Sequence, residues 1–265
     1  MTKAGEAAWH ACERTPSPRS CACVKPTAII LAAGVGRRFG AELGERPKAL
    51  LQVRSETLLG RLVRQLRATG VERIVIVVGW GAEHIEALFA GAAGVEILRN
   101  PDYRRGAILS LWTARKHLEA DRPVLVMDAD VFGPDEMIAR LVGSAHESCF
   151  LLDGSAEATG EEQMLMVRGE RVVDIARVPR GAYDQLGESI GFLRLSAEAS
   201  RVLLGLLAER VERGDVDLEH EEVYPELLAR VEVGFEPADD LAWTEIDFPE
   251  DLERARALAV GTEEA

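Results

Sequence analysis

The amino-acid sequence predicts an α/β fold of three layers, with helices on both faces of a mostly parallel sheet. Two short apolar runs, 27–33 and 71–79, are each followed or ended by glycine, which is typical of parallel strands buried on both faces. Between them, apolar residues recur at helical spacing over 58–68, and Gly70 follows as a C-cap residue would. Strand, helix and strand in this order predict a βαβ crossover.

The same alternation continues along the chain and then changes in texture. The further elements that we expect in the first half are a helix at 82–89, a strand at 95–98, a helix at 108–118 and a strand at 123–127. In the second half we expect partly antiparallel strands at 149–152, 164–167, 172–178 and 189–195, helices at 197–212 and 219–230, a strand at 242–247 and a helix at 249–258. We therefore expect one domain over 26–260 with a small antiparallel C-terminal elaboration.

Composition and charge exclude several classes of protein. The chain has 265 residues, 47% hydrophobic and 29% charged, which suits a globular protein with a sizeable core. Its net charge of -14 argues against a nucleic acid or an anionic membrane surface as the main partner. No apolar run reaches the ~18 residues of a membrane span and no secretory h-region is present, so we expect a cytoplasmic protein. The sequence leaves the oligomeric state open, with a homodimer as one alternative.

Residues 1–25 lack periodicity and are expected to be a disordered extension. Three of the four cysteines, Cys12, Cys21 and Cys23, lie there with His10, but their spacing matches no standard zinc site. A flexible tail is therefore the favoured interpretation over a metal cluster. The fourth, Cys149, falls in an expected buried strand, where cysteine acts as a small hydrophobe.

A glycine-rich, basic turn follows the first strand. It runs from Leu31 to Gly40 as LAAGVGRRFG, and Arg46-Pro47-Lys48 comes close behind. Glycines let the backbone approach a polyanion, and the flanking arginines and lysine neutralise phosphates. The stretch thus predicts a cradle for a nucleoside triphosphate, with an ordinary strand-to-helix turn as the alternative.

Carboxylates at the ends of expected strands form a second candidate cluster. Asp128 and Asp130 follow the strand at 123–127, and Asp247 ends the last expected strand. Two carboxylates are a usual way to hold Mg²⁺ for phosphoryl or nucleotidyl transfer. For Asp130 and Asp247 we favour Mg²⁺ over a capping or ion-pair role, whereas for Asp128 the two interpretations stay even.

Several other chemistries are not supported. The glycine spacing is not the dinucleotide fingerprint, and the chain has no Gly-Lys pair for a P-loop. No histidine stands in a recognisable triad context, so structural or surface roles are expected for His84, His117, His146 and His220.

These motifs together resemble the signature of the nucleotidyltransferases that make activated sugars and alcohols. The matching blocks are the glycine-rich run from Leu31 to Gly40 with Pro47-Lys48, then Asp128-Ala129-Asp130, then Glu245-Ile246-Asp247, in the order of that superfamily. Bacterial phosphocholine cytidylyltransferases look closest, through Ser110-Leu111 and the final Glu-Ile-Asp block. The resemblance implies a Rossmann-like sheet of the nucleotide-diphospho-sugar transferase type.

The resemblance also implies roles for individual residues. Arg38 would grip the β- and γ-phosphates, Lys48 would bridge the α-phosphate and the attacking phosphate, and Asp130 and Asp247 would be the Mg²⁺ ligands. The nucleotide would be bound by Leu31, Ala32, Ala33, Gly34, Gly36, Arg37, Gly79, Ser110 and Asp128. A choline head group would want aromatic faces and carboxylates, and the candidates are Glu221, Glu222, Tyr224 and Trp243.

The expected reaction transfers CMP from CTP, or a nucleotide from another NTP, to a phosphorylated small alcohol such as phosphocholine, with release of pyrophosphate. A phosphomonoester with a second pKa of ~6 is already mostly dianionic, so it needs no general base. The alternatives are uridylyl transfer to a sugar 1-phosphate or inositol phosphate, a metal-dependent glycosyltransferase, and a non-catalytic nucleotide sensor. One departure from the phosphocholine enzymes is Gly106-Ala107, where they resemble Asn-Asn.

Overall fold

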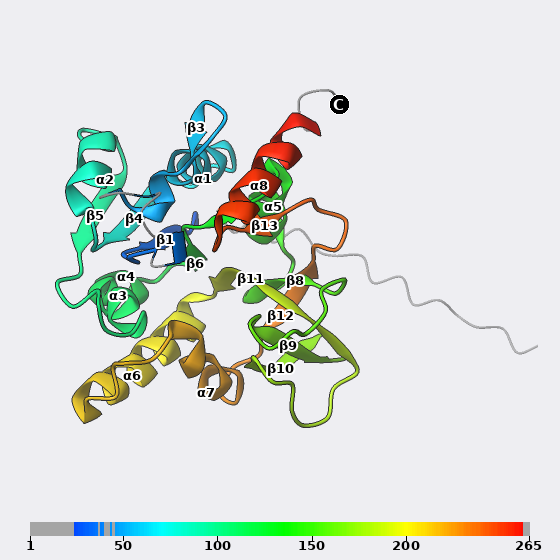
Figure 1. Ribbon diagram of the computed structural model, residues 1–265. Helices are drawn as coiled ribbons and strands as arrows, with labels where there is room; N and C mark the ends of the chain where they lie inside the picture. Colours follow the sequence, from blue (N-terminus) through cyan, green and yellow to red (C-terminus); the bar gives the residue numbers. More distant parts are fainter. Residues whose placement is uncertain (1–23, 37, 40–42, 44–45, 262–265) are drawn as a thin grey trace, which may run out of the picture.

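Four parallel strands form the first half of the sheet, which has nine strands within the described residues (Figure 1). The computed structural model describes residues 24–36, 38–39, 43 and 46–261. The parallel strands are β1 (Thr27–Ala32), β4 (Arg73–Val78), β5 (Val95–Arg99) and β6 (Val124–Asp128), in the spatial order β6-β1-β4-β5. Nearly every residue of β1, β4 and β6 is buried, as their unbroken apolar runs predict.

The second half of the sheet is mostly antiparallel. Strand β11 (Gln185–Leu195) runs antiparallel to β6 and joins the two halves. The other strands are β8 (Cys149–Asp153), β9 (Met164–Arg168), β10 (Arg171–Ala176) and β12 (Gly234–Pro237). β9 and β8 pair with β11, β10 pairs with β9, and β12 pairs in parallel with β8. A mostly parallel central sheet with an antiparallel elaboration is thus confirmed.

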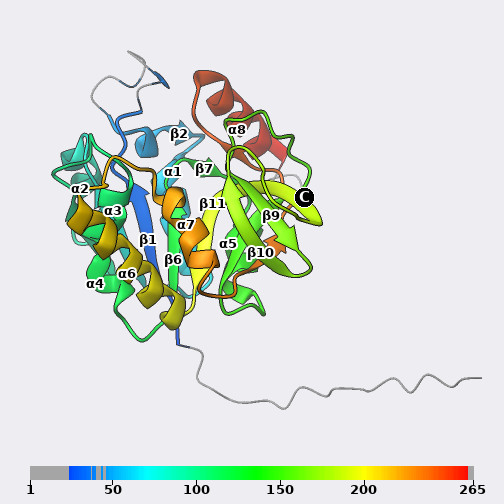
Figure 2. The ribbon, with the colours of Figure 1, turned by 90° about the horizontal axis from the view of Figure 1, so that it is seen from below.

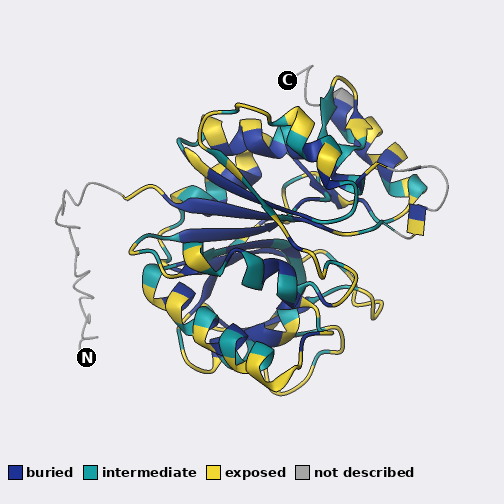
Figure 3. Cartoon of the chain, turned by 90° about the vertical axis from the view of Figure 1, so that its left-hand side faces the viewer, coloured by how far each residue is buried: buried dark blue, intermediate teal, exposed yellow. Residues whose placement is uncertain are grey.

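Helices cover both faces of the sheet, which gives the three layers seen in Figure 2. One face packs against α1 (Leu58–Ala68), α2 (Ala82–Leu88) and α5 (Asp135–Gly143) through a shared apolar cluster. The other face packs against α3 (Ile108–Thr113), α4 (Arg115–Leu118), α6 (Ala197–Arg213) and α7 (Tyr224–Leu228). Figure 3 shows the strands as the buried middle layer.

Local signals set the ends of the main helices. Thr57 caps α1, where its Oγ1 accepts a hydrogen bond of 3.0 Å from the backbone N–H of Gly60. Ser196 caps α6 in the same way through Ala199, and Gly214 ends α6 in the left-handed conformation. None of the helices in the described ranges is both long enough and apolar enough to cross a membrane.

The structure corrects several expected elements. The helix expected at 108–118 is two short helices that break at Ala114, and the one expected at 219–230 is a 3-10 turn, η3 (His220–Val223), followed by α7. The strand expected at 242–247 shrinks to β13 (Thr244–Glu245), which pairs with β7 (Val131–Phe132). The sequence interpretation missed β7, β12, α5, the hairpin of β2 (Gln52–Val53) with β3 (Glu56–Thr57), and the turn η2 (Lys48–Leu50).

The expected disordered extension and its cysteines lie outside the described residues, apart from 24 and 25. The last helix, α8, spans Pro249–Gly261 with proline at its start, as expected. Cys149 is fully buried in β8, and burial raises its pKa to about 11, so its thiol stays protonated near neutral pH.

Candidate active site

A cavity of about 490 Å³ opens where β1 and β6 end at the carboxyl edge of the sheet. This is the edge at which ligands bind in open α/β sheets. One wall comes from the loop after β1, the end of β6 and the segment around β13. The other wall comes from the segment before β9, the residue after β10, the middle of β11, and η3 with the residue before it. Segments far apart in the sequence therefore meet around one space.

Two basic residues and two carboxylates make the centre of the first wall. Lys48 Nζ lies 2.6 Å from Asp130 Oδ2 and 2.7 Å from Asp247 Oδ1. Arg38 Nη1 pairs with Asp247 Oδ2, and its guanidinium lies 5.3 Å from the centre of the Phe248 ring. The structure thus brings together Arg38, Lys48, Asp130 and Asp247, the four residues for which the sequence predicts catalysis and metal binding.

The side chain of Lys48 stays protonated in the site. Burial lowers the pKa of its ammonium group, but the attraction of Asp130 and Asp247 outweighs burial and raises the pKa above its ordinary value of 10.5. Lys48 is therefore a fixed cation, 16% exposed, that pairs with two carboxylates lining the cavity.

The small β7–β13 ribbon explains why Asp130 and Asp247 meet. Asp130 directly precedes β7 and Asp247 comes two residues after β13, so the antiparallel pairing places them side by side. The backbone N–H of Ile246 donates a 3.0 Å hydrogen bond to the carbonyl of Asp130. Asp251 then accepts hydrogen bonds from the backbone N–H groups of Asp247 and Phe248, which fixes the start of α8.

The carboxylates in this wall fit a divalent cation. Ligand oxygens of Asp130, Glu245 and Asp247 lie within 4.8 Å of one another. Asp130 Oδ1 is buried and has no hydrogen-bond partner, so it is an acceptor that a cation would satisfy. Hard carboxylate oxygens are the ligands that Mg²⁺ prefers. Loss of solvation and the repulsion of Asp130 and Asp247 raise the pKa of Glu245 to about 9, a repulsion that a bound cation would relieve.

Glu245 was missed as a site residue, although the sequence carries a signal for it. Glu245 and Asp247 stand two residues apart at the end of an extended segment, so their side chains fall on the same side. Because side chains alternate between the two sides of an extended segment, a site that contains Asp247 is expected to contain Glu245 as well.

The loop after β1 presents part of its backbone to the cavity. Leu31, Ala33 and Gly34 line the cavity, whereas the side chain of Ala32 is buried in the core below the sheet. Gly36 has a φ of +62°, and a Cβ there would lie 2.7 Å from Leu43 Cδ1, so the turn needs glycine. Arg37 and Gly40 lie outside the described residues.

Gly79 and Ser110 support the same loop from the neighbouring elements. A Cβ on Gly79 would lie 2.4 Å from Tyr103 Cβ and 2.8 Å from the carbonyl oxygen of Ala33, so Gly79 packs behind the loop. Ser110 lines the cavity, and its Oγ accepts a 3.0 Å hydrogen bond from the side-chain amide of Asn100.

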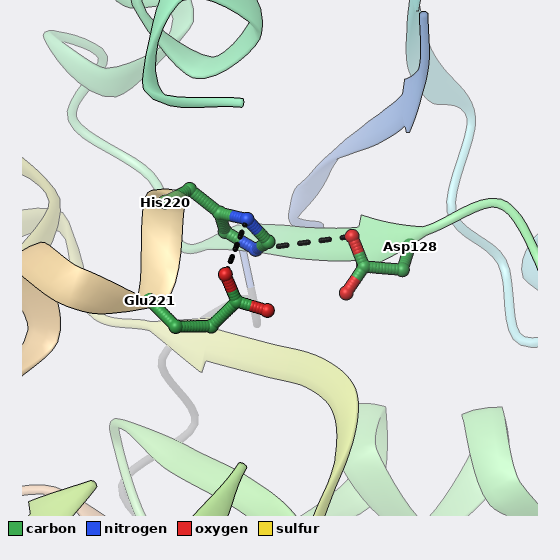
Figure 4. Close-up of side chains that lie close together, drawn as sticks. All are labelled: Asp128, His220 and Glu221. Atoms are coloured by element: carbon green, nitrogen blue, oxygen red, sulfur yellow. Dashed lines mark ion pairs between the residues drawn. The ribbon is translucent and has the colours of Figure 1, made fainter. Parts of the chain in front are cut away.

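Asp128, His220 and Glu221 form a second cluster in the cavity, here called the His220 cluster (Figure 4). Nδ1 of His220 lies 2.9 Å from Glu221 Oε2, and its Nε2 lies 3.8 Å from Asp128 Oδ1. Burial lowers the pKa of His220, but the attraction of Glu221 and Asp128 raises it to about 9. With this raised pKa, His220 carries a proton near neutral pH and forms an ion pair with Glu221.

His220 was expected to be structural or at the surface, and its place in the cavity is a finding of the structure. The sequence carries no signal for this place, because His220 lies on a short 3-10 turn that reaches the cavity only through the tertiary fold. Burial, and then the repulsion of Glu221, raises the pKa of Asp128 above its ordinary value, although the attraction of His220 opposes this shift.

The four residues expected to hold a choline head group do not come together. Glu221 lines the cavity, but Glu222 turns away and accepts a hydrogen bond from the backbone N–H of Glu219. Tyr224 is buried beneath His220, with ring centres 5.6 Å apart. Trp243 packs on the core and donates a 2.8 Å hydrogen bond to Asp153 Oδ2. In the described structure these residues do not build an aromatic cage.

Known proteins resemble this chain in sequence and in fold. The family model of the MobA-like NTP transferase domain matches residues 28–184. A bifunctional IPC transferase and DIPP synthase of Rubrobacter xylanophilus is 35% identical over 243 residues, which are 88% of this chain and 52% of that protein. This chain thus spans about half the length of that relative.

Two solved structures share the fold. The CTP:phosphocholine cytidylyltransferase of Streptococcus pneumoniae has a TM-score of 0.72 and 22% identity, and the match covers 89% of this chain and 100% of that one. The inositol-1-phosphate CTP transferase of T. maritima has a TM-score of 0.72 and 19% identity, with 90% and 98% covered. Because the family model covers more than half of the sequence, this chain belongs to the family of MobA-like NTP transferase domains.

Proposed function

We propose that this protein transfers CMP from CTP to a phosphorylated small alcohol and releases pyrophosphate and a CDP-alcohol. The observation that carries the proposal is the pairing of Lys48 and Arg38 with Asp130 and Asp247 beside the glycine-rich loop. Lys48 and Arg38 lie next to a candidate cation site, and positive charge at this place would reduce the repulsion between two phosphate-bearing substrates. The two solved structures that share the fold are named as transferases that use CTP, one with phosphocholine and one with inositol 1-phosphate. Their names support the choice of nucleotide and of acceptor class.

In the proposed reaction, an oxygen of the acceptor's phosphate attacks the α-phosphorus of CTP. The bond between the α-phosphorus and the bridging oxygen to the β-phosphorus breaks, and its electrons leave with pyrophosphate. The acceptor phosphate is dianionic at neutral pH, so no side chain has to remove a proton. The work of the protein is to hold the two phosphates in line and to neutralise charge, which suits Lys48 and Arg38.

We propose that Asp130 and Asp247, with Glu245 beside them, hold Mg²⁺. The unpartnered Oδ1 of Asp130 and the closeness of the three carboxylates support this assignment. When bound, the ion would neutralise phosphate charge. Lys48 and Arg38 contact the same carboxylates and are therefore placed to exchange them for phosphate oxygens when the substrates bind.

A matrix of nucleotides and acceptors tests the proposed reaction through pyrophosphate release. CTP, UTP, ATP and GTP are each combined with phosphocholine, phosphoethanolamine, aminoethylphosphonate, inositol 1-phosphate and glucose 1-phosphate. We expect pyrophosphate only when an acceptor is present, and most of it with CTP. Consumption of a preformed NDP-sugar without pyrophosphate would indicate a glycosyltransferase instead. Tight binding of CTP without turnover over the whole panel would indicate a nucleotide sensor.

Removal of either proposed ligand should abolish metal-dependent turnover. We expect Asp130→Asn and Asp247→Asn each to lower kcat at least 100-fold, because each loses a carboxylate oxygen for the ion. Titration calorimetry with Mn²⁺ should show weaker binding in both. Asp121→Asn is the matched control, since Asp121 is 96% exposed and pairs only with Arg201 in the described structure. Wild-type turnover in either ligand variant would remove that residue from the metal site.

A further inference from the structure

The wall that faces the phosphate-binding residues has its own charge pattern. It carries the carboxylates of Glu162, Glu188, Glu219 and Glu221, which line the cavity. Two cations stand among them. His220 contacts Glu221, and Arg177 lies close enough to Glu219 and Glu221 to shift their pKa values. This wall therefore supplies cations of its own to Glu219 and Glu221.

In the His220 cluster, His220 and Glu221 of this wall meet Asp128 from the end of β6. The His220 side chain is 6% exposed, and Glu221 and Asp128 are 18% and 22% exposed. Gly191 leaves room for Asp128, because a Cβ at Gly191 would lie 2.6 Å from Asp128 Oδ2. The fold thus holds a buried imidazolium between two carboxylates and keeps one side of the group open to the cavity.

The cluster offers both donors and acceptors of hydrogen bonds. Glu221 and Asp128 have carboxylate oxygens, and His220 has N–H groups. Below them, the hydroxyl of Tyr224 is buried without a hydrogen-bond partner. Burial, and then the charges of Glu221 and Asp128, raise its pKa well above 10, so it keeps its proton.

Aromatic faces are nearly absent from this part of the cavity. Apart from His220 itself, Phe248 is the one aromatic residue among the described residues that line the cavity, and it lies beside Arg38 on the opposite wall. A quaternary ammonium group has no N–H to donate and depends on aromatic faces for its recognition. The described residues of this wall therefore lack the aromatic faces that would bind a quaternary ammonium group.

We propose that the His220 cluster, with Arg177 beside it, binds a neutral head group with several hydroxyls, so that the acceptor is the phosphomonoester of a polyol. This inference rests on the proposed function and names its acceptor. Hydroxyl groups donate to carboxylates and accept from N–H groups, and this wall offers both partners. A primary ammonium would find Glu221 already paired with His220 and close to Arg177.

The test compares three acceptors on the wild-type protein with CTP and Mg²⁺. The probes are myo-inositol 1-phosphate, phosphoethanolamine and phosphocholine, and kcat/KM is measured for each by pyrophosphate release. We expect the polyol phosphate to exceed both of the others at least 100-fold, because a site built around hydroxyls leaves buried polar groups unpaired with other head groups. A higher kcat/KM with phosphocholine or phosphoethanolamine would overturn the inference and leave the proposed function standing. No turnover with CTP and any acceptor of the larger panel would instead remove the proposed function.

A variant of His220 tests whether the His220 cluster binds the head group of the acceptor. His220→Gln keeps a hydrogen-bonding side chain but removes the cation from between Glu221 and Asp128. We expect the KM for inositol 1-phosphate to rise about tenfold or more, with the KM for CTP within about twofold of wild type. His84→Gln is the matched control, since His84 is 39% exposed and lies on α2, away from this cavity.

An equal rise in both KM values would assign His220 a structural role and contradict the inference, as would an unchanged KM for the acceptor. The thermal midpoint of each variant shows whether it is folded. If His220→Gln does not fold, the comparison of acceptors on the wild-type protein still decides the inference.

Discussion

Lys48 shows at the scale of one residue how the site is poised before substrates bind. Its ammonium group lies within 2.7 Å of two carboxylates from different parts of the chain. Removing one preorganised donor from such a site costs about 100- to 1,000-fold in turnover. We expect this loss in kcat for Lys48→Gln, measured by pyrophosphate release with saturating substrates.

The control for Lys48→Gln is Lys116→Gln, because Lys116 is an exposed lysine on α4 that contacts neither Asp130 nor Asp247. The control should keep wild-type turnover. A Lys48→Gln protein that is folded and retains more than a tenth of the wild-type kcat would contradict the role given to this ammonium group.

Glu188 leads to a prediction about pH and stability. Burial, and then the charges of Glu162 and Asp153, raise its pKa from 4.5 to about 7. The carboxyl group of Glu188 therefore binds a proton more tightly in the folded protein than in the unfolded chain. The contribution of this protonation to the free energy of unfolding is complete below about pH 4.5. That contribution is lost as the pH rises to about 7.

We expect Glu188→Gln to be more stable than the wild type at pH 8, and we expect the difference to shrink toward pH 4.5. The free energies of unfolding in urea at a series of pH values measure this. A difference between the two proteins that does not change with pH would show that the carboxyl group of Glu188 does not titrate in this range in the folded protein.

Some of the site residues could be predicted from the sequence, and others could not. Arg38, Lys48, Asp130 and Asp247 stand in motifs whose spacing carries their chemistry, and the structure brings them together. His220 stands in no motif. It reaches the cavity because of the packing of η3 against the rest of the fold, which no local pattern reports.

At the scale of elements, the loop before η3 is locked to the start of α3. The backbone N–H groups of Gly106 and Ile108 donate hydrogen bonds to the carbonyls of Val216 and Leu218. A Cβ on Gly106 would lie 2.2 Å from the backbone of Leu218. Glycine at position 106 thus has a physical reason, because the loop that leads to η3 occupies the space of a side chain.

We expect Gly106→Ala to push this loop outward and to move His220. A misplacement of about 1 Å in a site can cost about 100-fold in rate, so we expect kcat/KM for the acceptor to fall by that order. Steady-state kinetics with the acceptor varied at saturating CTP measure it.

The matched control is Gly205→Ala on α6, where a Cβ would meet nothing within 4 Å. This control should keep full activity and gain up to about 1 kcal/mol in stability, because alanine favours the helix. Equal kinetics in Gly106→Ala and in the wild type would show that the loop does not depend on this close approach.

The elements that were predicted well are those with a strong internal pattern. The helix expected at 58–68 has the bounds of α1, and its buried positions include Leu58, Leu59, Leu62, Val63 and Leu66, the apolar residues at helical spacing. The strands β7 and β13 are only two residues long, so they carry no periodicity. Only their pairing across more than a hundred residues of sequence defines them, and that pairing builds the carboxylate site.

At the scale of the whole molecule, the charge distribution fits a polyanionic substrate only locally. The net charge of -14 repels nucleotides in general. Arg38 and Lys48 place positive charge at one point of the sheet edge, beside the carboxylates that suit a divalent cation. The opposite wall is left to discriminate the acceptor. In the proposed function, phosphate chemistry and head-group recognition would therefore lie in different parts of one cavity.

The transfer of the α-phosphate tests this account most directly. The protein is incubated with Mg²⁺, myo-inositol 1-phosphate and CTP labelled with ³²P either at the α- or at the γ-phosphorus. The account predicts that α-label appears in a CDP-polyol and that γ-label appears in pyrophosphate, both only when the acceptor is present. Release of α-label as free CMP, or of γ-label as inorganic phosphate, would contradict it, because the bond broken or the acceptor used would then be a different one.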